Sequence, residues 1–89
     1  NTFSLVENKN IHGNHTINGW DILYDENSDL FLLSLQHKMY VLNIDSQGNI
    51  IDVVLDINDR FGRLTKNIND NGYFAVDMSV QKDFKIITN

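Results

Sequence analysis

Polar and hydrophobic residues alternate along most of this chain, which is the pattern of β-strands that bury one face. The alternation is clearest over residues 73–80, where we expect Phe74 and Val76 to face the core while Tyr73 and Asp77 face solvent. Short apolar pairs near the two ends of the chain predict closing strands, at Phe3 with Leu5 and at Phe84 with Ile86. The same period of two is found in four more segments, at residues 20–25, 31–36, 39–45 and 49–56.

Short stretches rich in Asp and Asn separate these segments and have the lengths that antiparallel hairpins need. They are "DENSD" (25–29), "DSQGN" (45–49) and "NDNG" (69–72). The last two lie within similar sequences, "NIDSQGNIIDVV" (43–54) and "NINDNGYFAVDM" (67–78), which we interpret as two hairpins with similar turns. Residues 7–19 contain two glycines and four asparagines and predict a long loop.

Residues 58–69 fit two local structures. Phe61, Leu64 and Ile68 have the spacing of one helix face, whereas Gly62 and Thr65 are poor helix formers. This segment is therefore either a short helix or an extended connection. In both cases the sequence predicts a mainly β fold in a single domain, 1–89, built as an antiparallel β-sandwich or barrel-like meander of about seven to eight short strands.

Composition narrows the class of protein. A hydrophobic fraction of 42% in 89 residues is enough for an ordinary core, and no apolar run approaches the ~18–20 residues of a membrane span, so we expect a soluble protein. The chain has no cysteine. This excludes the disulfide-rich class of small secreted proteins and favours the cytoplasm over the periplasm or secretion, while leaving the compartment open.

The acidic balance of the chain bears on its partners. Twelve acidic residues against seven basic ones give a formal net charge of −5. Nucleic acids and anionic membranes need a basic surface, so neither is an expected partner. An acidic protein instead attracts a basic protein and speeds its capture by electrostatic steering.

Two stretches have the spacing of calcium ligands without the chemistry. In the first, Asn67, Asn69 and Asn71 precede Gly72, but these ligands are neutral and Met78 occupies the position where a calcium loop has its bidentate Glu. In the second, "DENSD" continues with a leucine where the loop needs glycine. Both stretches are therefore interpreted as turns.

The histidines and serines give no clear catalytic pattern. His12 and His15 are three residues apart in the predicted loop, with Asp21 as the nearest third ligand. No serine lies in a G-x-S-x-G context. We expect no catalytic residue, no metal site and no cofactor; a small metal-dependent or hydrolytic enzyme using His12 and His15 is the least favoured alternative.

A distributed acidic surface is the strongest candidate site. If the alternation is assigned correctly, several carboxylates and one tyrosine project away from the core. Such a surface either keeps the sheet soluble or forms a recognition face for a basic protein. The candidate partner-binding residues are Asp21, Asp25, Asp45, Asp52, Asp56, Tyr73 and Asp77.

Residues 20–54, "WDILYDENSDLFLLSLQHKMYVLNIDSQGNIIDVV", resemble one blade of a β-propeller, with four strands separated by tight turns. A second, poorer blade runs from residue 62 to the end. Two blades cannot close a propeller, so this resemblance implies assembly of several chains, as in small lectins.

The chain is also similar to bacterial toxin-neutralising immunity proteins in size, acidity, β-richness and lack of catalytic motifs. This resemblance rests on class properties, and it implies an antitoxin-like role. Our first hypothesis is a non-enzymatic immunity or inhibitor protein that binds a basic toxin or enzyme, as a monomer or homodimer. The alternative is a carbohydrate-binding or propeller-forming module that acts as an oligomer.

Overall fold

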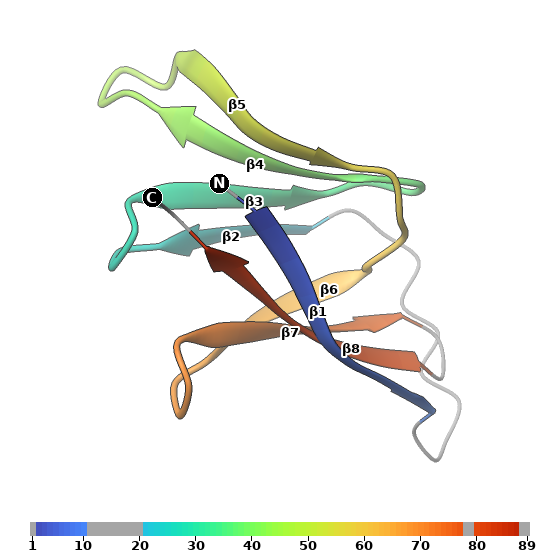
Figure 1. The fold of residues 1–89 in the computed structure, drawn as a ribbon. Coiled ribbons are helices and arrows are strands. Elements are labelled where there is room, and N and C mark those ends of the chain that lie inside the picture. The colour runs from blue at the N-terminus through green and yellow to red at the C-terminus, as the bar shows by residue number, and fades with distance from the viewer. Residues whose placement is uncertain (1, 11–20, 78–79, 88–89) are drawn as a thin grey trace.

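The computed structural model of this chain describes residues 2–10, 21–77 and 80–87, and it is all-β within these ranges (Figure 1). Two four-stranded antiparallel sheets are packed against each other, which confirms the predicted mainly β, sandwich-like fold. The strands are β1 (Thr2–Asn10), β2 (Asp21–Asp25), β3 (Leu30–Ser34), β4 (Met39–Ile44), β5 (Ile50–Ile57), β6 (Arg63–Asn67), β7 (Gly72–Asp77) and β8 (Val80–Ile87).

The two sheets differ in how the chain builds them. The first is a meander in chain order, β2-β3-β4-β5, and the second has the order β1-β8-β7-β6. In the second sheet the N-terminal strand completes a meander of the last three strands, because Thr2 pairs with Ile87 and Leu5 pairs with Phe84. The predicted closing strands are therefore confirmed, and they close the fold on each other.

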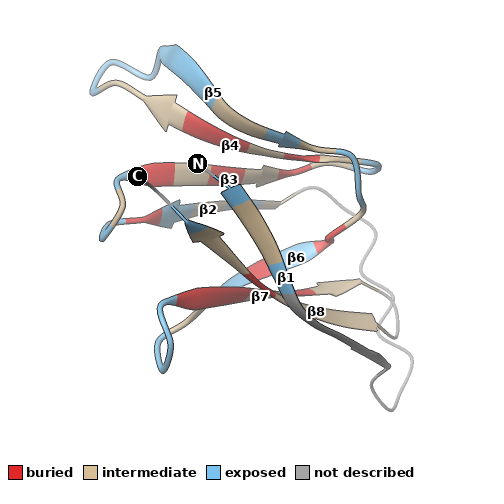
Figure 2. Cartoon of the chain, viewed as in Figure 1, coloured by how far each residue is buried: buried red, intermediate tan, exposed pale blue. Residues whose placement is uncertain are grey.

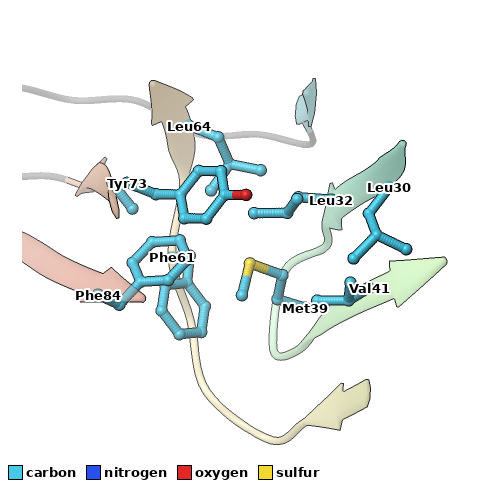
Figure 3. Close-up of a cluster of buried hydrophobic side chains, with 9 residues drawn as sticks. Leu30, Leu32, Met39, Val41, Phe61, Leu64, Tyr73 and Phe84 are labelled. Atoms are coloured by element: carbon cyan, nitrogen blue, oxygen red, sulfur yellow. The ribbon is translucent and has the colours of Figure 1, made fainter. Parts of the chain in front are cut away.

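The core lies between the sheets and joins aliphatic side chains on one side to aromatic ones on the other (Figure 3). The rings of Phe61 and Phe84 have centroids 5.1 Å apart, and Tyr73 stacks on Phe84 at 5.4 Å. Such ring pairs stabilise a core beyond the area that they bury. The buried residues of the cluster are Leu30, Leu32, Met39, Val41, Phe61, Leu64, Tyr73, Ala75 and Phe84.

The structure reverses the expected faces of β7. Tyr73 and Ala75 are buried, at 3% and 0% exposure, while Phe74 and Val76 are only half-buried on the other face. The expectation of an exposed Tyr73 was therefore wrong. Because both faces of this strand carry apolar residues, the period of two located the strand without identifying the face that is buried.

A bulge changes the faces of β5. Val41 pairs with Leu55, but the next residue, Leu42, pairs with Val53, so Val54 is an extra residue. Leu55 packs on the core whereas Val53 is half exposed, although strict alternation over residues 49–56 predicts that these two residues share a face. Figure 2 shows the consequence, since one end of β5 is exposed while β3 and β4 contain buried positions.

Three predicted segments have different structures. Of the two structures predicted for residues 58–69, the helix is wrong. Gly62 has φ +79°, which is incompatible with an α-helix, and Arg63–Asn67 form a strand that pairs with β7. The expected single strand over 73–80 is divided between β7 and β8, in which Asp77 pairs with Val80. The loop predicted at residues 7–19 belongs to β1 as far as Asn10, and residues 11–19 lie outside the described residues. No helix in the described ranges is long and apolar enough to span a membrane.

The three predicted turns are confirmed. In the β6–β7 hairpin, Asn67 Oδ1 accepts a hydrogen bond from Asn69 N at 3.2 Å, and Asp70 Oδ1 accepts one from Gly72 N at 2.9 Å. In the β4–β5 hairpin, Asp45 accepts hydrogen bonds from two turn amides. The two similar stretches are therefore hairpins in which Asx side chains bind the turn backbone.

We predict that Gly62→Ala destabilises the protein by more than about 3 kcal/mol, because the residue has positive φ and an added Cβ would lie 2.5 Å from Val76 O. Gly48→Ala is the matched control, since Gly48 also has positive φ but no atom within 4 Å of an added Cβ. It should cost about 1 kcal/mol. Urea unfolding of both variants checks this; equal losses would contradict the proposed clash.

Candidate interaction surface

Asp25 and Tyr73, two of the predicted partner-binding residues, meet inside the protein. Asp25 is the last residue of β2 and is only 5% exposed. Its Oδ2 accepts hydrogen bonds from the Tyr73 hydroxyl, from Lys66 Nζ at 3.1 Å and from Ser28 Oγ at 3.0 Å, and its Oδ1 accepts one from Asn27 N. These bonds join β2 to β6 and β7, so this carboxylate connects the two sheets.

The electrostatics of this cluster favour a charged Asp25. Burial opposes its ionisation, but the hydrogen bonds from Tyr73, Lys66, Ser28 and Asn27 outweigh burial and lower the pKa of Asp25 below its ordinary value. Burial and the adjacent carboxylate raise the pKa of Tyr73, so its hydroxyl stays protonated and acts as a donor. Lys66 Nζ also lies 4.4 Å from the centre of the Tyr73 ring.

Two more of the predicted residues make structural contacts. Asp21 Oδ2 accepts a hydrogen bond from Leu64 N at 2.8 Å, which links β2 to the edge of β6. Asp77 forms an ion pair with Arg60, and its side chain is only 13% exposed. The Asp77 carboxylate is therefore largely buried and not part of an exposed acidic face, whereas Asp21 is partly exposed beside its contact with β6.

The other three predicted residues are at least partly exposed and lie on β5 or in the turn before it. Asp45 accepts hydrogen bonds from Asn49 N and Gln47 N, which lower the pKa of its carboxyl and tie it to its turn. Asp52 is exposed on β5. Asp56 forms an ion pair with Lys38 at 3.1 Å. The structure therefore does not bring the predicted acidic residues together as one site.

An apolar surface that the sequence analysis missed lies on the outward side of the β2–β5 sheet. Cross-strand pairing places its members in rows, since Tyr24 pairs with Phe31, Phe31 with Leu42, and Leu42 with Val53. The residues between them along β3 and β4 point into the core, so these side chains lie on the opposite side. We call this surface the apolar face: Ile22, Tyr24, Phe31, Leu33, Tyr40, Leu42 and Val53.

The apolar face is exposed at its two edges and close-packed at its centre. Ile22 and Val53 are 57% and 50% exposed, whereas Leu42 is buried between its two neighbours. The rings of Tyr24 and Phe31 have centroids 4.7 Å apart. A contiguous apolar surface containing aromatic rings is typical of protein interaction sites.

Charged groups border the apolar face. Tyr24 donates a hydrogen bond from its hydroxyl to Asp29 Oδ1 at 2.8 Å. At the other side, Lys38 Nζ lies 5.0 Å from the centre of the Tyr40 ring and pairs with Asp56. The face thus has an apolar centre and polar margins, which is the usual composition of an interface.

The sequence contains the alternation that produces this face but not the contacts that decide its direction. Ile22, Tyr24 and Trp20 alternate with Asp21, Leu23 and Asp25, and we had assigned the carboxylates to the solvent side. If Asp21 and Asp25 point inward, their carboxylates need hydrogen-bond donors, and these donors come from β6 and β7. Because those partners are about 40 residues away in the sequence, local patterning could not supply them.

A shallow hollow of about 310 Å³ lies beside Asp25, between the β2–β3 and β6–β7 turns. Its walls include Tyr24, Asn27, Lys66 and Asn71. Lys66 already donates to Asp25 and to Asn71 O, so the groups in this hollow mainly bind each other. Among the described residues no three His, Asp or Glu side chains are arranged for a metal ion; His12 and His15 lie outside the described residues.

We predict that Asp25→Asn costs about 2–4 kcal/mol of stability at pH 7, because Lys66 loses the charged acceptor that compensates its partial burial. The pKa of Asp25 is lowered on folding, so its contribution is present above an ordinary carboxyl pKa of 3.8 and is lost as the pH falls through the lower folded value. Denaturant unfolding at several pH values should show that the difference in unfolding free energy between Asp25→Asn and the wild type becomes smaller below about pH 4.

The exposed Asp52→Asn variant is the control for this prediction and should change stability by less than about 0.5 kcal/mol. The prediction would be contradicted if the difference in unfolding free energy between Asp25→Asn and the wild type stayed constant into strong acid. That result would show that the ion pair does not stabilise the fold.

Comparisons of this chain with protein-family models, with curated proteins and with solved structures found no match. We therefore infer its function from the surfaces of the two sheets.

Proposed function

We propose that this protein works by binding another protein through the apolar face. The observation that carries this proposal is a continuous sheet surface of apolar and aromatic side chains, exposed at Ile22, Tyr24 and Val53, with carboxylates at its margins. Leaving such a surface in water is unfavourable by roughly 25 cal/mol per Å² of apolar area, so a partner that covers it gains that free energy. Aromatic anchors such as Tyr24 and Phe31 commonly dominate binding at such sites.

The charge of the protein favours a basic partner. Asp29 and Asp56 border the apolar face, and the whole chain has a formal net charge of −5. Such a surface steers a basic protein toward it and repels an acidic one. We propose an immunity or inhibitor protein that covers part of a basic toxin or enzyme, with the apolar face replacing the acidic surface that the sequence predicted.

A second function is favoured by the topology. The β2–β5 sheet is a four-stranded meander, as in a propeller blade, and β1 completes the β6–β8 meander as a fourth strand. Sheets of this kind stack face to face in propellers, so a propeller-forming module that assembles with other sheets is the second candidate. In both functions the apolar face is the contact surface.

The test is capture of a partner from cells of the source organism by three immobilised proteins. They are the wild type, the variant Ile22→Gln/Val53→Gln, and the control Ile68→Gln/Leu5→Gln, which changes two exposed apolar residues outside the apolar face. We expect the wild type and the control to retain the same basic protein, and the Ile22→Gln/Val53→Gln variant to bind it tenfold or more weakly.

The purified partner then tests the inhibitor role. Its association rate with the wild type should fall as salt rises from ~50 to ~300 mM, because electrostatic steering is screened. If the partner is an enzyme or toxin, the wild type should suppress its activity and the Ile22→Gln/Val53→Gln variant should not. A partner held equally by all three proteins would rule out the apolar face as the contact surface.

A further inference from the structure

The outer side of β5 has no partner strand among the described residues. This strand is the last in the order β2-β3-β4-β5, and it pairs with β4 (Figure 1). The other edge of the same sheet contacts the second sheet, because Asp21 Oδ2 on β2 accepts a hydrogen bond from Leu64 N on β6. Alternate residues of β5 therefore direct backbone N–H and C=O groups away from β4, where a further strand can pair with them.

The first half of β5 exposes apolar side chains along this edge. Ile50, Ile51 and Val53 are 60%, 63% and 50% exposed, and Figure 2 shows this end of the strand as exposed. The strand contains neither Lys nor Pro, two residues that commonly protect exposed edges from pairing. A strand added here would cover apolar area as well as form backbone hydrogen bonds.

The charges near this edge are acidic. Residues 39–59 contain no Lys or Arg and four aspartates, which are Asp45, Asp52, Asp56 and Asp59. Two of these form ion pairs, Asp56 with Lys38 and Asp59 with Lys82. The hydrogen bonds that Asp45 accepts come from neutral groups of its own turn, and Asp52 forms no ion pair within the described residues. Both therefore keep a negative charge that can attract a basic segment.

The two sides of β5 present different groups to an added strand. Asp52 and Val53 are successive residues, so their side chains lie on opposite sides of the sheet. Val53 is on the side of the apolar face. An added strand in which apolar and basic residues alternate would place its apolar side chains beside Val53 and its basic ones beside Asp52. An acidic strand, including β5 of a second copy, would instead set carboxylates against Asp52.

Bulges in β5 restrict the form of the segment that can pair with it. The strand has one extra residue relative to β4 at Ile51 and another at Val54. Such bulges increase the twist of a strand and interrupt its regular ladder of hydrogen bonds. A flexible segment can follow this twist, whereas the edge of a flat sheet cannot. The geometry therefore favours a terminus or loop of the partner over a strand that already belongs to a sheet.

We propose that β5 binds an extended segment of the basic partner, which adds to the β2–β5 sheet as a fifth strand. This inference rests on the proposed function and names the part of the partner that is held beside the apolar face. Main-chain hydrogen bonds would supply part of the affinity, and the alternation of apolar and basic side chains would supply the specificity.

The test uses two peptides of ~8 residues that have the same sequence, alternating Lys and Val, and the same charge. In one of them every peptide nitrogen is methylated, so it has no backbone donors. The unmethylated peptide should bind with a Kd on the order of 100 µM at ~50 mM salt, and the methylated one at least tenfold more weakly. Hydrogen exchange should show that the unmethylated peptide slows the exchange of amides within Ile50–Ile57.

A charge reversal on β5 tests the position of the site. Asp52→Lys should bind the unmethylated peptide about tenfold more weakly, because an attraction becomes a repulsion. Glu26→Lys is the matched control: it makes the same change of charge at an exposed residue in the β2–β3 turn and should change the Kd by less than about twofold. Circular dichroism checks that both variants are folded. Equal binding of the two peptides, no binding of the unmethylated peptide at ~1 mM, or equal effects of the two variants would each overturn the proposal.

The variant Ile22→Gln separates this inference from the proposed function. Ile22 is exposed on β2, at the opposite edge of the sheet from β5. Ile22→Gln should therefore bind the unmethylated peptide like the wild type while retaining less of the captured partner. If the peptide does not bind and the Ile22→Gln/Val53→Gln variant still loses the partner, pairing at β5 is overturned and the apolar face remains the contact surface. If the peptide protects β5 but all three immobilised proteins hold the partner equally, the proposed role of the apolar face is overturned instead.

Discussion

The hydrogen-bonded ion pair between Asp25 and the second sheet is the interaction on which this structure depends. One carboxylate of β2 receives the Tyr73 hydroxyl and the Lys66 ammonium, and so fixes the end of β2 against β6 and β7. Figure 3 shows the Tyr73 hydroxyl directed across the core toward the strand that carries Leu32. A buried charge of this kind is tolerated only because each of its oxygens has a donor. The contact therefore specifies how the two sheets meet as well as adding stability.

The inward direction of Asp25 determines what β2 shows to solvent. Successive side chains of a strand point to opposite faces, so directing Asp21 and Asp25 toward the second sheet exposes Ile22 and Tyr24 on the other side. The same arrangement continues across the sheet through the pairs of Tyr24 with Phe31 and of Phe31 with Leu42. The apolar face is thus a direct consequence of the polar contacts between the sheets. A protein that uses carboxylates to join its layers has fewer of them on the surface.

Several of the other acidic residues bind groups within the protein. Asp77 forms an ion pair with Arg60 and is largely buried, whereas Asp59 forms an ion pair with Lys82 at 2.9 Å and is about half exposed. Asp45 is bound to the amides of its own turn. The formal net charge of −5 therefore describes the long-range field of the molecule better than it describes any local acidic patch. That field favours basic partners, while the local contacts that hold a partner are apolar and aromatic.

The sequence by itself determined the strands and the turns, because both depend on near neighbours. Alternation located most of the β-segments, and Asx residues such as Asp45 and Asp70 marked the hairpins that their side chains stabilise. It also limited the segment after Asn58 to two local structures, of which pairing with β7 selected the strand. These features follow from φ/ψ preference and local hydrogen bonding.

Only the tertiary structure decided which face of each strand is buried. The strand containing Tyr73 is apolar on both sides, and the strand containing Ile22 carries Leu23 between two carboxylates on its other side, so alternation alone did not identify the buried side. The choice came from contacts between distant residues: Lys66 and Tyr73 supply the donors for Asp25, and an extra residue at Val54 changes the side of Val53. Each of these contacts is made only when the two sheets pack together, because their partners lie far apart along the chain.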